Sequence, residues 1–258
     1  MDNISIEDSI RRDLATTFMG RHIVHYETLP STMDVARKIA AEGAPEGTLV
    51  LAEEQTVARG RRGRVWVSPK GSLALSLILR PSLEELPRLV MVASLAVSRS
   101  IQQATGLKAD IKWPNDVLIR GKKVCGILIE NALRGQVVDW AVVGIGINVS
   151  LDIALYPDIS AIATSLSSEA GREVPRLDVL RLLLVQMERL YLASRRGEPV
   201  YDEWQNRLIT LGKRIRVRFG EAIEEGLAES VDKDGALLLR RSDGRLTTVT
   251  AGEVTLLK

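Results

Sequence analysis

The stretch ADIKWPNDVLIRGKKVCGILIENA, residues 109–132, carries the pattern that decides the fold class. Two apolar runs of strand length flank the turn sequence IRGKK around Gly121, which predicts a β-hairpin. The next stretch, QVVDWAVVGIGINVS at 136–150, continues this pattern, so the two stretches together predict three or four strands. Pro114 interrupts regular strand pairing, which would let the polar side chains around it turn into a cleft.

Outward from this segment, predicted strands and helices are interleaved along the chain. The helix that follows Pro30 has Ser31 or Thr32 as its cap, Asp34 in its first turn and Gly43 at its end. This order predicts one large core of interleaved helices and strands. The expected strands span 21–29, 48–55 and 72–80, and the expected helices span 5–19, 30–43, 87–105, 177–195 and 198–210.

The pattern changes after Leu211. From there the chain has only short alternating segments, separated by FGEA, DKDG and SDG, which describe a small β-barrel of about 45 residues. We therefore predict a larger domain over 1–210, with an N-terminal helix within residues 1–20, and a separate domain over 211–258.

The composition is that of an ordinary globular protein, with 45% apolar and 26% charged residues. A formal net charge of +2 gives no global field for binding DNA, so any polyanion must be bound locally. The single cysteine, Cys125, excludes an internal disulfide framework and fits a reducing compartment. The N-terminus lacks the apolar run of a signal peptide, and no stretch approaches the roughly 20 apolar residues that span a bilayer. We expect a cytoplasmic protein without a membrane partner.

The stretch ARGRRGRVW, residues 58–66, concentrates positive charge on a segment that leaves the end of the strand at 48–55. The planar fork of arginine fits phosphate or carboxylate oxygens, and glycines let backbone amides approach an anion closely. A solvated basic loop is the simpler alternative. The position at a strand end favours a loop that closes over a phosphorylated ligand. The stretch contains Arg59, Gly60, Arg61, Arg62, Gly63, Arg64 and Trp66.

Other common ligand motifs are absent or incomplete in the sequence. No GxxxxGK[ST] occurs, which argues against a P-loop NTPase. GIGIN at 144–148 begins like a dinucleotide-binding fingerprint but lacks the third glycine and the following helix. His22 and His25 share one predicted strand without a cysteine or carboxylate cluster at ligand spacing, so a strand surface is favoured over a metal site.

Lys123 is the other candidate for chemistry. Strand alternation predicts that it lies on the same side as Cys125, Ile127 and Ile129, where its charge would need a partner. Alternatively, Lys123 is simply the exposed first residue of its strand. Lys122 is expected to point to solvent, and Cys125 to be a small buried apolar residue, since no base is evident for a nucleophile.

Five segments, PSTMDVA, EEQTVARGRRGRVW, KWPNDV, GKKVCGILIE and GIGINV, resemble the biotin protein ligases in order and approximate spacing. The tail AGEVTLL resembles that family's C-terminal SH3-like domain. The resemblance covers roughly residues 20–258, and the arginine loop joined to KWPND is its most specific part. It implies an α+β fold, in which helices flank a central mixed β-sheet as in the core of class II aminoacyl-tRNA synthetases, followed by a small C-terminal SH3-like β-barrel. The form resembled is the short one without an N-terminal DNA-binding domain, so no DNA partner is expected.

The resemblance implies a reaction in two steps. The carboxylate of biotin attacks the α-phosphate of ATP to give biotinyl-5′-AMP, and a lysine ε-amine of a carrier protein then displaces AMP. Biotin, ATP and Mg²⁺ are the implied substrates and cofactor. The implied partner is a biotin carboxyl carrier protein, the biotinyl domain of an acyl-CoA carboxylase, and a homodimer paired through the central sheet is also implied.

The resemblance further implies the site residues. Lys123, Arg61 and Arg59 would be catalytic, with Lys123 at the carboxylate and the reacting phosphate. No residue is assigned to a metal, because Mg²⁺ would be bound mainly through the phosphates of ATP. The implied biotin-binding residues are Ser31, Thr32, Met33, Gln55, Arg59, Gly60, Arg61, Lys123 and Gly126, with Ser31, Thr32 and Gln55 at the ureido ring. The implied ATP-binding residues are Arg61, Arg64, Trp66, Lys112, Asn115, Asp116 and Asn148.

Two departures from the family pattern affect this site. The family's loop usually begins with glycine, but here Val57 and Ala58 precede Arg59, so the hinge would be stiffer or lie further along the loop. Met33 stands where asparagine is also common, which would remove a side-chain hydrogen bond.

Three other functions stay open from the sequence. A lipoate–protein ligase or another acyl-adenylating transferase would share the core, although the polar Ser31, Thr32 and Gln55 favour a ureido ring over an apolar dithiolane. A nucleic-acid-binding module would need further basic clusters and stacking aromatics, which are scarce at 4%. A non-catalytic scaffold would not need both Arg61 and Lys123.

Overall fold

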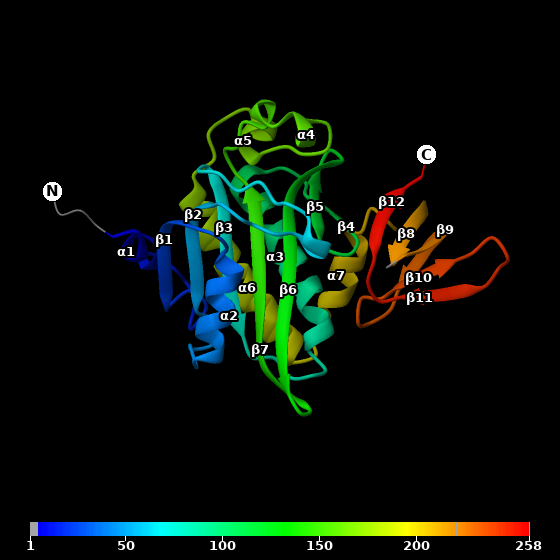
Figure 1. The fold of residues 1–258 in the computed structure, drawn as a ribbon, viewed down its shortest axis with the longest axis horizontal. Coiled ribbons are helices and arrows are strands. Elements are labelled where there is room, and N and C mark those ends of the chain that lie inside the picture. The colour runs from blue at the N-terminus through cyan, green and yellow to red at the C-terminus, as the bar shows by residue number, and fades with distance from the viewer. Residues whose placement is uncertain (1–4, 220, 258) are drawn as a thin grey trace.

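The centre of the molecule is a seven-stranded sheet, seen in a computed structural model that describes residues 5–219 and 221–257. The strand order is β1-β2-β3-β7-β6-β5-β4 (Figure 1). β1 and β2 run parallel and the other neighbours run antiparallel, so the sheet is mixed, as the sequence predicts. The strands are β1 (Ile23–Leu29), β2 (Leu49–Gln55), β3 (Ser72–Leu79), β4 (Asp110–Lys112), β5 (Asp116–Ile119), β6 (Lys122–Arg134) and β7 (Val137–Asn148).

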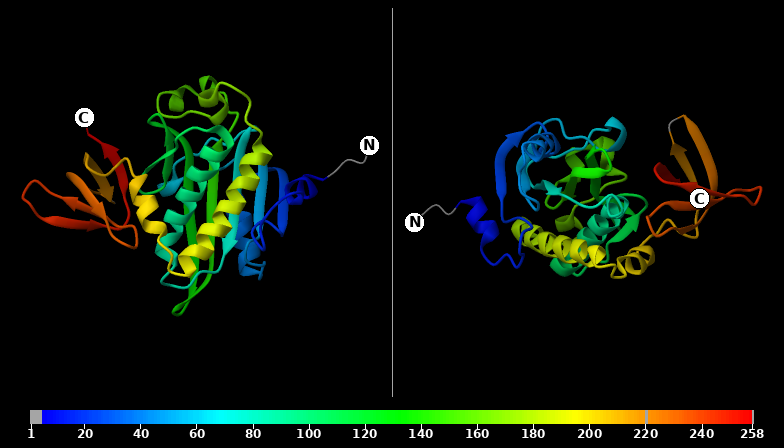
Figure 2. Two further views of the ribbon diagram at one scale, coloured as in Figure 1. Left: turned by 180° about the vertical axis from the view of Figure 1, so that it is seen from behind. Right: turned by 90° about the horizontal axis from the view of Figure 1, so that it is seen from below.

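Helices cover both faces of this sheet (Figures 1 and 2). α2 (Thr32–Ala41) packs on one face, while α3 (Leu89–Thr105) and α6 (Arg176–Arg195) cover the other. Every residue of β3 is buried, because a central strand covered on both sides has no solvent face. The predicted α+β class is therefore confirmed.

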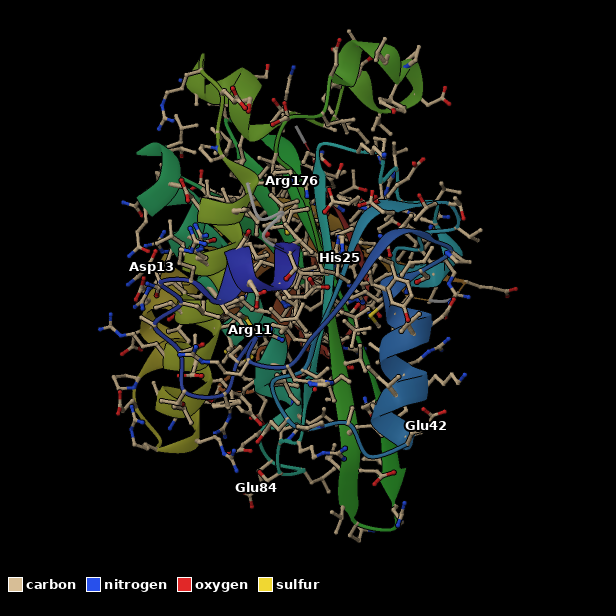
Figure 3. All side chains as sticks on the ribbon, turned by 90° about the vertical axis from the view of Figure 1, so that its left-hand side faces the viewer. Arg11, Asp13, His25, Glu42, Glu84 and Arg176 are labelled. Carbon is tan, nitrogen blue, oxygen red and sulfur yellow. The ribbon has the colours of Figure 1, made fainter. Side chains whose placement is uncertain are left out.

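The predicted helix over 5–19 is wrong in length. α1 spans only Ile6–Arg11, and the chain then leaves helical geometry, with Asp13 at a left-handed φ of 63°. The carboxylate of Glu188 on α6 accepts hydrogen bonds from the backbone N–H groups of Thr17, Phe18 and Met19, at 2.7, 2.9 and 2.9 Å. Backbone groups bound in this way are not available to a helix. Figure 3 shows this side of the molecule, with Arg11 and Asp13 labelled.

The remaining short helices lie around the main sheet. α7 is shorter than the predicted 198–210, and the segment between β7 and α6 contains two helices that the sequence analysis missed. Both missed helices are of five residues or fewer, too short for an apolar period to be visible. The missed helices are α4 (Pro157–Ser160) and α5 (Leu166–Ala170). The other short helices are η1 (Arg61–Gly63), η2 (Leu86–Arg88), η3 (Ile153–Leu155) and α7 (Val200–Asn206).

The chain after α7 forms a second, antiparallel sheet with the order β11-β10-β9-β8-β12. Alternation along β8 buries Ile215 and Val217, whereas the three arginines that alternate with them are exposed, as for a sheet with one covered face. This sheet corresponds to the small β domain predicted from the sequence. Its strands are β8 (Arg214–Phe219), β9 (Ala222–Val231), β10 (Leu237–Arg240), β11 (Leu246–Val249) and β12 (Glu253–Leu256).

Trp113 of the KWPND stretch lies in the contact between the two sheets. It is 2% exposed and belongs to the same apolar cluster as Trp204, Ile215 and Leu237. Its indole Nε1 donates to the backbone oxygen of Gly235 at 2.8 Å. The interruption of strand pairing at KWPND therefore also serves to attach the C-terminal sheet. In the described part of the chain, no helix combines the length and apolar character needed to cross a bilayer.

Candidate active site

A cavity of about 340 Å³ opens where the arginine loop crosses the sheet. Figure 1 shows the chain after β2 running across the front of the sheet towards β12. The cavity brings together every residue that the resemblance assigns to biotin or ATP. These are Ser31, Thr32, Met33, Gln55, Arg59, Gly60, Arg61, Arg64, Trp66, Lys112, Asn115, Asp116, Lys123, Gly126 and Asn148.

Glycines on β6 and β7 form the floor of the cavity. Gly126 and Gly146 are cross-strand partners, and Trp66 lies over both of them. A Cβ at Gly146 would lie 2.5 Å from the indole Nε1 of Trp66, and one at Gly144 would lie 2.5 Å from Sδ of Met33. Only residues without side chains let these groups approach the sheet so closely. The GIGIN pattern is thus explained by packing on the sheet and not by a dinucleotide-binding turn.

One end of the cavity is polar. The side-chain oxygen of Gln55 accepts from the backbone N–H of Thr32 at 2.8 Å and from its hydroxyl at 3.1 Å. The amide nitrogen of Gln55 donates to Ser68 Oγ at 3.2 Å, and Ser76 Oγ donates to Thr32 Oγ1 at 2.9 Å. Ser31 is buried beside them at the N-cap of α2, without a side-chain capping bond. Fixed donors and acceptors at the end of an apolar cavity suit a compact polar group.

Met33 lies in the apolar cluster between α2 and the sheet, beside Val142 and Leu128. It therefore lines the cavity with a thioether.

The arginine loop is a narrow hairpin. The N–H of Trp66 donates to the oxygen of Ala58 at 3.0 Å, and the N–H of Gly60 donates to the oxygen of Arg64 at 2.8 Å. Left-handed backbone conformations occur at Arg62 and Gly63, with φ values of 59° and 71°. The turn of the loop thus lies at Arg62 and Gly63, and Ala58 is buried at the base of the loop.

Two arginines of the loop are held by the C-terminal sheet. Arg61 Nη1 donates to Asn115 Oδ1 at 3.1 Å and to the backbone oxygen of Gly252 at 3.3 Å. Arg64 forms an ion pair with Glu253 at the start of β12. Burial lowers the pKa of Arg61, and the neighbouring charge of Arg62 adds to this effect. The sequence analysis missed Gly252 and Glu253, since nothing local marks them as part of a site in another sheet.

Lys123 does not lie on the side that strand alternation predicts. Val117 pairs with Cys125 but the next residue, Leu118, pairs with Lys123, so β6 carries a bulge at Val124. Val124 and Cys125 both pack into the main core. The extra residue turns Lys123 to the opposite face of the sheet.

On this face the charge of Lys123 has partners. Its Nζ lies 2.6 Å from Asp116 Oδ1 and 5.3 Å from the ring centroid of Trp66. Burial lowers the pKa of Lys112, which Asp116 partly offsets and Lys123 reinforces. The cavity therefore gathers cationic groups around one carboxylate, an arrangement that an anionic ligand can complete.

The remaining predicted residues have structural contacts. Asn115 Nδ2 donates to the oxygen of Ile127 at 2.7 Å, and the buried Asn148 donates to the oxygen of Thr164 at 3.1 Å. Burial raises the pKa of Cys125, which fits a small apolar core residue and not a nucleophile.

His25 lies away from the cavity. Its Nε2 is 3.2 Å from Glu53 Oε1, and Arg176 Nη2 is 2.6 Å from the other carboxylate oxygen (Figure 3). Burial alone would raise the pKa of Glu53, but Arg176 and His25 hold it below its ordinary value. Glu53 thus pairs with both His25 and Arg176, and these contacts connect β2 with β1 and with the start of α6.

An α+β domain whose cavity combines a polar pocket, a glycine floor and an arginine hairpin is suited to binding a small anionic ligand beneath that hairpin. The comparisons with known proteins agree. Residues 26–148 match the Biotin/lipoate A/B protein ligase family, and residues 210–257 match the Biotin protein ligase C terminal domain. The chain belongs to the biotin protein ligase family.

Individual relatives cover most of the chain. It is 40% identical to the bifunctional ligase/repressor BirA of Bacillus subtilis, over 92% of this chain and 75% of that protein. It is 39% identical to the biotin–[acetyl-CoA-carboxylase] ligase of Paracoccus denitrificans, over 87% of this chain and 96% of that protein. The structure of the Aquifex aeolicus biotin protein ligase in complex with biotin and ATP superposes with a TM-score of 0.78 at 27% identity, covering 92% and 99% of the two chains.

Proposed function

We propose that this protein is an ATP-dependent biotin protein ligase. It activates biotin as biotinyl-5′-AMP and transfers the biotinyl group to a lysine of a biotin carboxyl carrier protein. The observation that carries the proposal is the single cavity in which the polar pocket of Ser31, Thr32 and Gln55 adjoins Lys123 and the arginine loop. A ligand with a polar ring, an apolar chain and a carboxylate fits that order of groups.

In the first step, a carboxylate oxygen of biotin forms a bond to the α-phosphorus of ATP, and the bond to the β-phosphate oxygen breaks to release pyrophosphate. Two anions must approach each other, so positive charge is needed where their oxygens crowd. Lys123 and Arg61, whose partners Asp116 and Asn115 are adjacent in the chain, would supply it, and Arg59 would cover the chain and the adenylate. The polar contacts of Ser31, Thr32 and Gln55 would fix the ureido ring and so orient the carboxylate.

In the second step, the lysine ε-amine of the carrier attacks the carbonyl carbon of the mixed anhydride. The amide bond forms, AMP leaves and the nitrogen loses a proton. The anhydride must be kept from water until then, and the glycine-containing tip of the arginine loop would serve as its cover.

Mg²⁺ would enter with the phosphates of ATP and neutralise their charge. The donor set fits this route, because the carboxylates that line the cavity, Asp116 and Glu253, are already paired with Lys123 and Arg64. Arg64, Trp66, Lys112, Asn115 and Asn148 would then bind the nucleotide side of the cavity.

The proposal includes the organisation of the chain and its partners. The catalytic domain would span 1–210 and the SH3-like domain 211–258, in the cytoplasm. The macromolecular partner would be the biotinyl domain of an acyl-CoA carboxylase. A homodimer would form through the central sheet, and sedimentation equilibrium with and without biotin would test this.

Pyrophosphate–ATP exchange tests the proposed function directly. Purified protein is assayed with Mg²⁺ and biotin, lipoate or no acid. Exchange with biotin alone is the expected result. Exchange with lipoate alone would keep the mechanism and change the substrate, and no exchange from folded protein would contradict the assignment. Incorporation of biotin into a carrier domain, but not into its lysine-to-arginine variant, tests the second step.

A further inference from the structure

A chain of alternating charges links the central sheet to the base of the arginine loop. Glu130 Oε2 on β6 lies 2.9 Å from Arg37 Nη1 on α2. Asp34, also on α2, accepts hydrogen bonds through one oxygen, Oδ1, from both Arg37 and Arg59. Four residues from three segments of the chain are therefore connected, and only Arg59 among them lines the cavity.

Asp34 is not needed for the backbone of its own helix. It lies in the first turn of α2, where a negative charge is favourable, but its contacts in the structure are with arginine side chains. Arg37 pairs with Glu130 through one guanidinium nitrogen and donates to Asp34 through another. These contacts hold the Asp34 carboxylate in the position in which it also accepts from Arg59. Among the side chains that Asp34 contacts through these hydrogen bonds, Arg59 is the one that lines the cavity.

Arg59 lies at the base of the loop, before its tip. It pairs across the hairpin with Val65, next to the buried Ala58. The left-handed residues Arg62 and Gly63 lie beyond it, at the tip. A contact that holds Arg59 on α2 thus fixes the base of the loop, separately from Arg61 and Arg64 nearer the tip, which contact the C-terminal sheet.

We propose that Asp34 is a positioning residue that holds the Arg59 guanidinium at the rim of the cavity before substrate arrives. The inference rests on the proposed function, in which Arg59 meets the acyl chain and the adenylate. An arginine side chain loses considerable rotamer freedom when it binds, so an arginine that is already fixed costs less to engage. The pair itself is about 45% and 42% exposed and therefore adds little to folding stability.

The test uses two readouts on Asp34→Asn. Hydrogen–deuterium exchange of residues 56–66 in the ligand-free protein reports on the loop without any substrate. Pyrophosphate exchange reports KM for biotin separately from kcat. We expect faster amide exchange in the loop and a KM for biotin raised about two- to tenfold, with kcat within about twofold of wild type.

Two variants control for other effects. Asp34→Glu keeps the carboxylate and should restore most of the wild-type KM. Asp178→Asn removes a matched pair, since Asp178 also lies in the first turn of a helix and pairs with the arginine three residues later, Arg181, at 3.2 Å. It should leave both readouts unchanged.

A double-mutant cycle with Arg59→Ala decides the route of the effect. If Asp34 acts through Arg59, Asp34→Asn should change KM in the wild-type protein but not in Arg59→Ala. An equal effect in both backgrounds, no effect in either, or a lower KM in Asp34→Asn would overturn the proposal; the last result would mean that Asp34 competes with substrate for Arg59.

The design separates this proposal from the proposed function. If the wild-type protein shows no biotin-dependent exchange, the ligase assignment fails. Loop exchange in Asp34→Asn then decides by itself whether Asp34 holds the loop base, and unchanged protection there would overturn the positioning role.

Discussion

Replacing Lys123 by methionine should separate its catalytic role from its contribution to stability. The side chains of Lys123 and Asp116 are 31% and 25% exposed, with Nζ 2.6 Å from Oδ1. An ion pair of this exposure is worth about 1 kcal/mol or less, and the contact with the Trp66 ring adds ~0.5–1 kcal/mol. A loss of ~1–2 kcal/mol lowers the melting temperature of a protein of this size by about 2–8 °C, so Lys123→Met should remain folded.

The expected loss of activity is much larger. A fixed positive charge at the reacting oxygens contributes about 2.7–4 kcal/mol, which corresponds to ~10²–10³-fold in the rate of biotin-dependent pyrophosphate exchange. The assay compares Lys123→Met with Lys122→Met, the adjacent exposed lysine, which should keep wild-type exchange. Exchange within tenfold of wild type, from Lys123→Met that melts normally, would refute the catalytic role. A large drop in melting temperature would show instead that the Asp116 contact is structural.

Three further predictions concern other parts of the molecule. Gly146→Ala should displace Trp66 from the cavity floor, because the new Cβ would lie 2.5 Å from the indole Nε1. A clash worth ~1–3 kcal/mol should lower the biotin affinity measured by titration calorimetry roughly 5- to 150-fold. Glu188→Gln should lower the free energy of unfolding at pH 7 by ~2–4 kcal/mol, since the carboxylate binds three backbone N–H groups of the N-terminal segment. Burial alone would raise the pKa of Glu188, but those hydrogen bonds hold it below its ordinary value. The difference in unfolding free energy between the two proteins, measured by denaturant titration, should therefore be full above the unfolded-state pKa, near 4.5. It should shrink as the pH falls through the lower folded-state pKa. Trp113→Phe should leave the oxygen of Gly235 without its donor and cost ~1–3 kcal/mol, seen as faster hydrogen exchange around residues 231–240 and not in the central strands.

The sequence located most of the secondary structure, because periodic burial is a local property. β3 and α3 follow the predicted ranges closely, since one is mostly apolar and buried throughout and the other runs to Gly106, which ends it in a left-handed conformation. The helix over 5–19 failed because its second half bonds to Glu188 on α6, more than 160 residues away in the chain. Helical spacing in the sequence cannot report such a competitor for backbone N–H groups.

In the candidate site, too, some features follow from the sequence and others from the tertiary structure. By itself the sequence determined which residue types could carry the chemistry: an arginine hairpin after a strand, a polar stretch at a helix start and a lysine beside a β-turn. Only the tertiary structure decided which partner each charge meets. Lys123 reaches Asp116 because a bulge at Val124 reverses the face of the strand, and Arg61 reaches Gly252 across 191 residues because a second sheet packs beside the first. Register and packing of distant segments set these contacts, and neither is encoded in the local spacing of residues.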